Sequence, residues 1–397
     1  MVINTDPQKI DELLTRGVEN IYPKKEWLQK ELESGRRLSL YTGYDPTAPT
    51  LHIGHGITLM KLRQFQDLGH RVIMLIGDFT GMIGDPTDKT AVRSALTKEQ
   101  VMENCREYQK QAGHILDFTG NNAVELKYNS EWLGKMNFAD VLQLTSHFTV
   151  QRMLERDMFD KRMKDAKPIY LHEFMYPVMQ GYDCVAMDVD GEVGGNDQTF
   201  NMLAGRTLMK DLKNKEKFVL AMKLLTDNAG KKMGKSEGNM IAFTDSPQDM
   251  FGKVMSWSDE MILNGFELCT RVNMDEIKQM EKEMKAGANP RDYKLKLAHE
   301  ITMTFLGESA AKIGREHFAT VIQSKDRPDE INELKPSAYD IVTVLVESKM
   351  ASSKTDARKL VVQNAVKIND QKADNIDAIV KPGDVIQKGK RFFVKVI

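Results

Sequence analysis

Two short motifs in this chain combine residue types that can bind negative charge. The first is Leu51-His52-Ile53-Gly54-His55-Gly56 and the second is Lys232-Met233-Gly234-Lys235-Ser236. His52 and His55 are three residues apart, so on a helix they share a face. The unpaired backbone N–H groups and the dipole of a helix N-terminus favour an anion, and two imidazole donors would add to this. By itself, the first motif is equally well explained by two surface histidines.

The second motif places two ammonium groups and a hydroxyl in a glycine-rich segment. Gly230, Gly234 and Gly238 flank Lys232 and Lys235, which predicts a loop that can close over a ligand. A lysine pair of this kind is usually a solvated charge run. Together and in this order, however, the two motifs predict a site that holds the polyphosphate of ATP from two sides.

Further polar residues surround these motifs. Tyr41-Thr42-Gly43-Tyr44-Asp45-Pro46-Thr47 stands at the end of an expected strand, where open α/β sheets form their ligand crevice. Tyr176, Gln180 and Asp183 follow the i, i+4, i+7 spacing of one helix face among apolar neighbours, which predicts a buried polar pocket. There Asp183 can accept a hydrogen bond from a buried hydroxyl, and a ligand without that hydroxyl would leave the acceptor unpaired.

Two turns complete the set of candidate ligand contacts. Gly194-Gly195-Asn196-Asp197-Gln198 lets the backbone approach a ligand closely, and its acid and amide suit ribose hydroxyls or a carboxylate. Asp85 lies in the turn Gly84-Asp85-Pro86. Its carboxylate either caps that turn or faces an ammonium group, and the sequence leaves both interpretations open.

The elements that must position these residues begin as an α/β domain. Residues 1–35 predict two amphipathic helices, 38–44 a strand, 53–68 a helix and 71–77 a buried strand. This βαβ order implies a parallel sheet with a right-handed crossover. We therefore expect a doubly wound, Rossmann-like catalytic domain.

Four regions are expected along the chain. They are a catalytic domain at 1–229, a mobile Lys-rich loop with a helical domain at 230–323, a polar Pro-bearing linker at 324–336 and a small α+β unit at 337–397. Within this C-terminal unit, a pair of short helices precedes three strands, at 365–369, 385–388 and 391–397.

Composition excludes several classes of protein. The net charge is −1, so a nucleic-acid surface must be local. Residues 337–397 hold 11 Lys/Arg against 7 Asp/Glu, a net charge of +4, and Lys354, Arg358 and Lys359 present their cations on one capped helix. This favours a partner with a phosphate backbone over a solvated domain of chance charge. Three widely spaced cysteines, no signal-like start and no apolar run near about 18 residues predict a cytoplasmic protein.

With these residues in view, the chain resembles the bacterial tyrosyl-tRNA synthetases, which are class I aminoacyl-tRNA synthetases. His52-Ile53-Gly54-His55 matches the first signature of that class without a change. Residues 232–236 resemble the second signature, which usually has a serine where this chain has Gly234. The resemblance covers nearly the whole chain, because 337–397 resemble the RNA-binding module of the ribosomal protein S-four type that these enzymes carry.

The resemblance implies a role for each matching residue. Tyr41 and Asp183 would bind the phenol hydroxyl of tyrosine, while Asp85, Tyr176, Gln180 and Gln198 would hold its ammonium and carboxylate groups. The ATP or adenylate contacts would be Thr42, Gly43, Asp45, Gly54, Thr58, Gly195 and Asp197. The residues acting on the phosphates would be Thr47, His52, His55, Lys89, Arg93, Lys232, Lys235 and Ser236. RNA would be bound by Lys354, Arg358 and Lys359.

The activity implied by the resemblance is a two-step ligase that makes tyrosyl-adenylate from tyrosine and Mg-ATP and then charges tRNA. Mg²⁺ would enter with ATP, since no dedicated protein metal site is evident. A homodimer is implied as well, with an interface within about 125–170, where Phe138, Val141, Leu142, Leu144 and Phe148 recur at helical spacing. Two alternatives remain: another class I nucleotidyl-transfer enzyme, such as a tryptophan enzyme or a small-molecule adenylyltransferase, and an RNA-binding protein without the chemistry.

Overall fold

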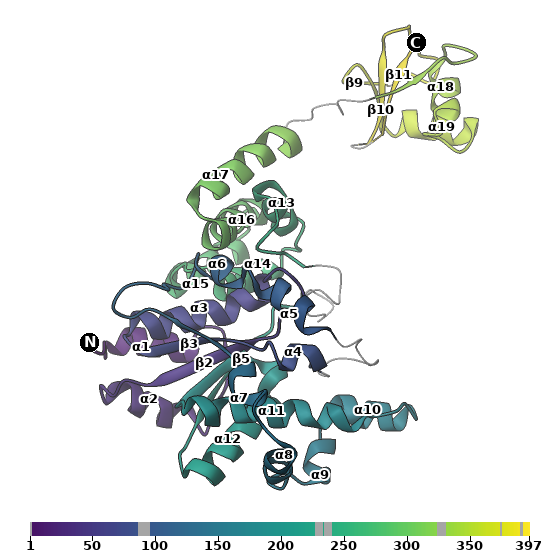
Figure 1. The fold of residues 1–397 in the computed structure, drawn as a ribbon. Coiled ribbons are helices and arrows are strands. Elements are labelled where there is room, and N and C mark those ends of the chain that lie inside the picture. The colour runs from purple at the N-terminus through teal and green to yellow at the C-terminus, as the bar shows by residue number, and fades with distance from the viewer. Residues whose placement is uncertain are drawn as a thin grey trace. The chain divides into compact units, whose positions relative to one another are not determined.

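A computed structural model describes residues 2–85, 96–226, 233, 240–323, 331–373, 375–389 and 392–397. The chain divides into two compact units, Met1–Phe318 and Ala319–Ile397 (Figure 1). No helix among the described residues is both long enough and apolar enough to cross a membrane.

The first unit is built on a six-stranded sheet in the order β1-β6-β5-β2-β3-β4. The strands are β1 (Val18–Tyr22), β2 (Ser39–Tyr44), β3 (Arg71–Ile76), β4 (Glu125–Tyr128), β5 (Gly191–Gly195) and β6 (Phe218–Met222). All neighbours pair in parallel except β1, which runs antiparallel to β6 at one edge. The expectation of a doubly wound, mostly parallel sheet is confirmed.

Helices cover both faces of this sheet, and β3 shows why. Met74 and Ile76 pack in one cluster with residues of α3 (Ile53–Asp67), whereas Ile73 and Leu75 pack in another with residues of α11 (Leu171–Met187) and α12 (Thr199–Lys213). Alternate side chains of a strand point to opposite faces, so a strand covered on both faces is apolar throughout. The helices are seen on either side of the sheet in Figure 1.

The N-terminal segment contains one element that was not predicted. The two helices expected within 1–35 are α1 (Pro7–Thr15) and α2 (Lys25–Glu33), and the strand β1 lies between them. β1 pairs with β6, which is about 200 residues later in the chain, so its stabilisation comes from a partner that the local sequence pattern does not contain.

Short helices fill the connections of the first unit. They are α4 (Thr80–Ile83), α5 (Lys98–Cys105), α6 (Tyr108–Ala112), α7 (Ser130–Leu133), α8 (Phe138–Thr145), α9 (Val150–Leu154), α10 (Asp157–Lys164) and the 3₁₀ turn η1 (Asn196–Gln198). Among these, α8 begins with Asn137 as its cap, since the Asn137 side chain accepts hydrogen bonds from the backbone of the first turn.

The stretch expected to be helical, 246–323, is helical, and its part up to Phe318 packs on the same core. It forms α13 (Pro247–Met255), α14 (Met261–Cys269), α15 (Met274–Lys285), α16 (Pro290–Leu306), α17 (Glu308–His317) and η3 (Phe318–Gln323). Phe305 of α16 lies directly against α3, because a β-carbon at Gly56 would be only 2.4 Å from its ring. A division of this unit into 1–229 and 230–323 stays a prediction, since one hydrophobic core spans both stretches.

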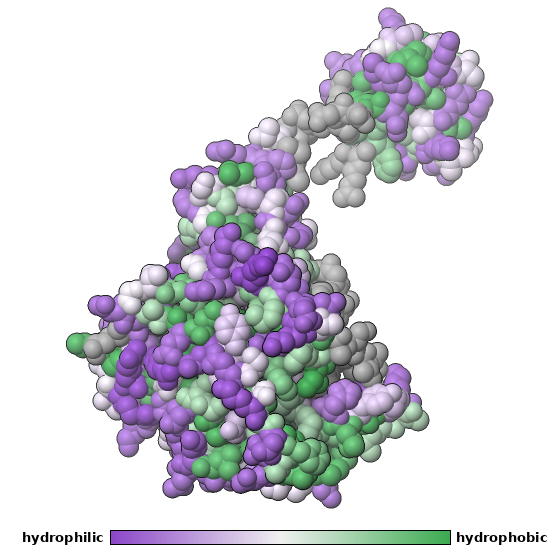
Figure 2. Space-filling view, in the orientation of Figure 1, coloured by the Kyte–Doolittle hydropathy of each residue, from purple (hydrophilic) through white to green (hydrophobic). Residues whose placement is uncertain are grey.

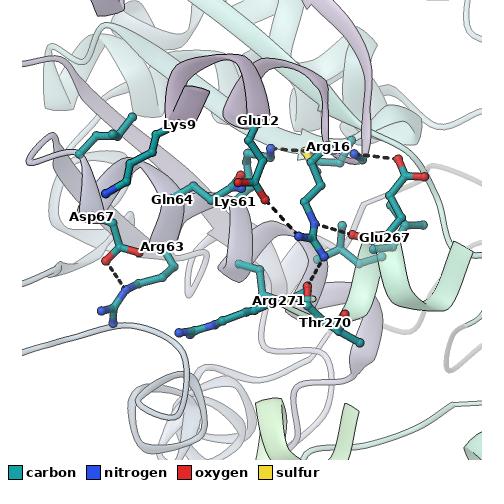
Figure 3. Close-up of a pocket in the computed structure, with 16 residues that line it drawn as sticks. Lys9, Glu12, Arg16, Lys61, Arg63, Gln64, Asp67, Glu267, Thr270 and Arg271 are labelled. Atoms are coloured by element: carbon teal, nitrogen blue, oxygen red, sulfur yellow. Dashed lines mark hydrogen bonds and ion pairs between the residues drawn. The ribbon is translucent and has the colours of Figure 1, made fainter. Parts of the chain in front are cut away.

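Two buried cations join the N-terminal helix to this core, beside a cavity of about 490 Å³ between α1, α3 and α14 (Figure 3). Arg16 donates to the carbonyl oxygens of Phe266, Glu267, Thr270 and Val272 and to the Glu12 carboxylate. Lys61 donates to the carbonyl oxygens of Leu13 and Arg16. Burial, reinforced by the Arg16 charge, lowers the pKa of Lys61 to about 7. The two side chains thus satisfy the carbonyl ends of α14 and α1.

The second unit is a small α+β domain with its own core. Its five-stranded sheet has the order β7-β11-β10-β8-β9, and its helices are α18 (Ile341–Glu347) and α19 (Lys354–Val362). The strands are β7 (Asn332–Leu334), β8 (Val366–Ile368), β9 (Gln371–Lys372), β10 (Val385–Lys388) and β11 (Phe392–Val396). β7 pairs in parallel with β11, so the last residues of the expected linker 324–336 belong to this sheet.

Candidate active site

A cavity of about 910 Å³ opens at the carboxyl ends of β2, β3 and β5. It is the place where open α/β sheets bind their ligands. Of the candidate residues in the first unit, it is lined by Tyr41, Thr42, Gly43, Asp45, Thr47, His52, Gly54, His55, Thr58, Asp85, Tyr176, Gln180, Asp183, Gly195, Asp197 and Gln198. Lys89, Arg93, Lys232, Lys235 and Ser236 lie outside the described residues.

The two histidines stand at the first turn of α3, as predicted. His52 is the N-cap, and its Nδ1 accepts a hydrogen bond from the backbone N–H of Gly54 at 3.1 Å. His55 Nδ1 accepts one from the backbone N–H of His52 at 3.2 Å, and the ring centroids are 3.8 Å apart. A ring nitrogen that accepts from an N–H carries no proton, so each ring is in the tautomer with its N–H at Nε2. Each imidazole therefore keeps one donor on the edge remote from that hydrogen bond.

Segments beside both motifs meet at this helix start. The Ile53 backbone N–H donates to the Ile241 carbonyl at 3.0 Å, and the Phe243 N–H donates to the Leu51 carbonyl at 2.9 Å. Met233, the middle of the second motif, lines the cavity and donates its N–H to the Leu225 carbonyl at 2.8 Å. The chain just after the second motif thus pairs with the first motif.

Asp183 is buried in the cavity wall, away from the helix start. One of its oxygens accepts from Trp132 Nε1 at 2.8 Å and the other from Asn129 Nδ2 at 3.3 Å. Burial raises the pKa of the Asp183 carboxyl well above its usual range, and these two hydrogen bonds oppose the shift. Tyr41 is fully buried, and its hydroxyl donates to the backbone carbonyl oxygen of Gln180 at 3.4 Å. Burial raises the pKa of Tyr41 as well, with the charge of Glu192 adding to the effect.

Asp45 joins the two halves of the cavity. Its Oδ2 accepts from the Tyr176 hydroxyl at 2.7 Å and its Oδ1 accepts from the Thr80 hydroxyl at 2.7 Å. Burial and the charge of Asp45 raise the pKa of Tyr176, so that hydroxyl stays a donor. Asp45, which was expected to contact the adenylate, is thus hydrogen-bonded to Tyr176, which was expected to contact the substrate ammonium.

Asp85 faces into the cavity from the end of the described segment. Its Oδ2 accepts from Gln198 Nε2 at 2.6 Å, and Arg156 Nη2 lies 3.7 Å from its Oδ1. Asn201, which is fully buried, donates through Nδ2 to Gln198 Oε1 at 2.9 Å. The cavity thus holds an acid and an amide side by side, as the placement of an ammonium and a carboxylate requires.

Sequence reasoning missed several residues of this site: Thr80, Asn129, Trp132, Arg156, Glu192, Asn201 and Lys217. Asn129 had a usable signal, because it follows β4 directly and parallel strands bring their ligand contacts to that end. Lys217 had none. It stands in the charged stretch Asn214-Lys215-Glu216-Lys217 that looks solvent-exposed, yet it is fully buried in an ion pair with Glu192.

In the second unit, α19 begins at Lys354 with Ser353 as its cap. Lys354, Arg358 and Lys359 are all exposed. Their role toward RNA stays a prediction. Among the residues that the structure describes, no cluster of three or more His, Cys, Asp or Glu side chains could hold a metal ion.

Comparisons with known proteins agree along the whole chain. The family described as tRNA synthetases class I (W and Y) matches residues 33–323, and the tyrosine–tRNA ligase SYY-like C-terminal domain matches 324–395. A tyrosine–tRNA ligase of Thermotoga maritima is 44% identical over 98% of both chains. One from Haemophilus ducreyi is 44% identical over 96% of both chains.

Solved structures share the fold at lower identity. A tyrosyl-tRNA synthetase of Archaeoglobus fulgidus complexed with L-tyrosine has a TM-score of 0.61 and 22% identity, covering 78% of this chain and 99% of its own. A C-terminally truncated mitochondrial tyrosyl-tRNA synthetase of Coccidioides posadasii has a TM-score of 0.65 and 23% identity, covering 78% and 91%.

Proposed function

Because this chain belongs to the tyrosine–tRNA ligases of the class I tRNA synthetases, we propose that its cavity carries out the two steps of tyrosine charging. The tyrosine carboxylate attacks the α-phosphorus of Mg-ATP, which gives tyrosyl-adenylate and pyrophosphate. A ribose hydroxyl of the terminal adenosine of tRNA then attacks the tyrosyl carbonyl, and AMP leaves. Mg²⁺ enters with the ATP substrate.

The observation that carries this proposal is the buried carboxylate of Asp183 at the closed end of the cavity. A carboxylate offers about four lone-pair positions, and Trp132 and Asn129 occupy two of them. The remaining acceptor capacity suits a phenol hydroxyl beside Tyr41. An amino acid without that hydroxyl would leave a desolvated acceptor unpaired, which is a strong basis for rejecting it.

The phosphate end of the cavity suits charge that develops during the reaction. The positive end of the α3 dipole lies here, and the imidazoles of His52 and His55, each with its N–H at Nε2, line this part of the cavity. The two-step reaction needs no covalent enzyme intermediate, so catalysis would rest on positioning and electrostatic stabilisation. The roles of Lys89, Arg93, Lys232, Lys235 and Ser236 rest on the family resemblance alone.

A homodimer is proposed as well, through the face formed by α8, α9 and the start of α11. Phe138 is 78% exposed, Val150 68% and Leu171 83%, and Figure 2 shows apolar surface over α8 and α9. Leu144, which was expected in the same set, is buried in the core of its own chain. A contiguous exposed apolar patch of this kind is typical of an interface. Loss of the dimer in a Phe138→Glu variant, measured by light scattering, would test this.

A tRNA partner and a cytoplasmic location complete the proposal. The second unit matches the C-terminal domain of the family and carries exposed cations on α19. The three cysteines, Cys105, Cys184 and Cys269, are free and buried, which fits a reducing compartment.

The experiment that tests the activity is ATP–pyrophosphate exchange on the purified protein without tRNA. Tyrosine, phenylalanine, tryptophan and methionine are offered separately. Exchange with tyrosine alone is the expected result. Exchange with tryptophan instead would overturn the assignment of Tyr41 and Asp183, and folded protein that exchanges with none of the four would favour an RNA-binding role without chemistry.

A further inference from the structure

Two glutamine amides in the cavity are held in opposite orientations by buried neighbours. We propose that Glu192, together with Lys217, and Asn201 are positioning residues that set these orientations and so match the cavity to an amino-acid zwitterion. Gln180 would present its carbonyl oxygen to the ammonium group, and Gln198 would present its NH₂ group to the carboxylate. This inference rests on the proposed function.

The orientation of Gln180 follows from its neighbour. Gln180 lies 2.9 Å from Glu192 Oε1, and a carboxylate only accepts hydrogen bonds, so the amide must turn its Nε2 toward Glu192. Glu192 itself is 2% exposed and is paired with the fully buried ammonium of Lys217, which also donates to the Met202 carbonyl at 3.0 Å. The acceptor that holds Gln180 is therefore fixed from behind.

The orientation of Gln198 follows from a second acid. Gln198 lies 2.6 Å from Asp85 Oδ2, and again only Nε2 can donate to that oxygen. The other end of the amide, Oε1, accepts from Nδ2 of the fully buried Asn201 at 2.9 Å. Asn201 thus fixes the oxygen end of the amide, which leaves the NH₂ end for Asp85 and for a ligand.

The two orientations matter because the opposite orientation would place a hydrogen-bond donor against a donor, or an acceptor against an acceptor. A flipped Gln180 would turn NH₂ toward the ammonium group, and a flipped Gln198 would turn its carbonyl oxygen toward the carboxylate. Releasing one amide should therefore lower the affinity for ligands that carry the group it contacts by about tenfold. The affinity for a ligand that lacks this group should not change. A general loosening of the pocket would lower both affinities alike.

The experiment measures the affinity of three ligands for the full-length protein by competition equilibrium dialysis. The ligands are tyrosine, tyramine (which lacks the carboxylate) and 3-(4-hydroxyphenyl)propionate (which lacks the ammonium). The variants are Asn201→Leu, which removes the donor at similar volume, and the double variant Glu192→Met with Lys217→Met. Replacing both members of a buried ion pair avoids leaving one charge alone, which is the change that would prevent folding.

The expected result is a crossed pattern. Asn201→Leu weakens the binding of tyrosine and the propionate about tenfold and leaves that of tyramine unchanged. The double variant weakens the binding of tyrosine and tyramine about tenfold more than that of the propionate, which shares only the effect of the Glu192–Lys217 pair on Tyr41. Lys61→Met serves as the matched control, because it removes another buried lysine whose partners are backbone carbonyls elsewhere. It should leave the affinity of all three ligands unchanged.

Two further outcomes keep the inference separate from the proposed function. Equal weakening of all three ligands in either variant, in protein with a wild-type melting curve, would overturn the inference. A wild-type protein that does not bind tyrosine would instead overturn the proposed function. Adding Gln180→Leu to the double variant should cause no further loss of tyramine affinity if Glu192 acts through Gln180, and an independent second loss would contradict that route.

Discussion

The two ends of the active-site cavity hold their polar groups in different ways. At the end that we propose binds tyrosine (the tyrosine end), buried side chains hold one another, as Trp132 and Asn129 hold Asp183. At the end that we propose binds phosphate (the phosphate end), backbone N–H groups hold the imidazoles of His52 and His55 at the start of α3. The first arrangement is buried in the core of the first unit, and the second lies at the end of one helix, where both imidazoles are half-buried.

This difference indicates a division of labour. A buried acceptor whose geometry is already fixed discriminates between substrates, because a wrong substrate leaves it desolvated and unpaired. Donors at a helix N-terminus act most strongly when negative charge grows, so their effect falls mainly on the transition state. Changes at the tyrosine end should therefore alter affinity and selectivity, and changes at the phosphate end should alter rate.

The largest effect is expected from Asp183→Ala. The change removes the acceptor of two N–H donors and of the substrate phenol, and charge-assisted hydrogen bonds contribute about 1.5–3 kcal/mol each. We expect kcat/KM for tyrosine in pyrophosphate exchange to fall by about 10²- to 10³-fold, whereas any exchange driven by a high concentration of phenylalanine should not fall in proportion. An equal fall for both amino acids would contradict a role in reading the phenol.

At the other end, His52→Asn is compared with His52→Ala. Asparagine preserves the cap on α3 but lacks the Nε2 donor, so it separates helix stability from catalysis. Both variants should slow adenylate formation in single-turnover experiments by about 10²-fold with little change in tyrosine affinity. Lys232→Ala is expected to behave alike on the basis of the family resemblance. If tyrosine affinity and the rate of adenylate formation fell equally, these residues would contribute to substrate binding and not specifically to the transition state. That result would contradict the proposed difference between the two ends.

A smaller effect is expected from Tyr176→Phe, at the junction of the two ends. The variant loses the hydrogen bond from the hydroxyl to Asp45 Oδ2. A single hydrogen bond of this kind contributes about 0.5–1.5 kcal/mol, so KM for tyrosine should rise by about two- to tenfold. The KM for ATP is measured alongside it. If the KM for ATP rises as much as the KM for tyrosine, Asp45 couples the two ends of the cavity, and the ends do not act separately.

The smallest kinetic effect is expected from Lys61→Met, which lies at neither end. Its effect should appear in stability instead. The folded-state pKa of about 7 is below the usual value for lysine, so between pH 7 and about 10 the unfolded chain binds more protons and the free energy of unfolding rises with pH. The slope from this one group is at most about 1.4 kcal/mol per pH unit, and it should be missing from denaturant titrations of the variant at pH 7, 8 and 9.

Much of the fold and the site is predictable because its signals are local. Three features show this: the helix start at His52, the buried strand 71–77 and the polar helix face of Tyr176, Gln180 and Asp183. The residues of each feature are close together in the sequence, and the structure has each feature where its pattern predicts it. The residue types and order of the two motifs predict one polyphosphate site, but the sequence does not show how the segment at 51–53 meets the second motif. The backbone pairing of Leu51 and Ile53 with residues 241–243 supplies the physical link.

The rest depends on partners that are distant in the sequence. Trp132 reaches Asp183 across 51 residues, and Lys217 reaches Glu192 across 25. Nothing in the neighbourhood of Lys217 distinguishes a buried lysine from a solvated one. The strand β1 was missed between the two expected helices for the same reason, since β6 is its only strand neighbour in the described sheet. A sequence pattern predicts which face of a helix or strand is apolar. It does not predict which polar side chains will be buried and paired with a residue far away in the chain.

The close contact between Phe305 and Gly56 bears on how the enzyme loses its structure when heated. The ring of Phe305 lies on the first turn of α3 and stacks on Phe243 with ring centroids 4.8 Å apart, so the turn that carries His52 and His55 is supported by a helix about 250 positions later in the chain. A shortened chain that ended after β6 would expose this apolar contact and leave the turn unsupported. The helical half is therefore a structural requirement for the catalytic half, and calorimetry should register both in a single cooperative endotherm.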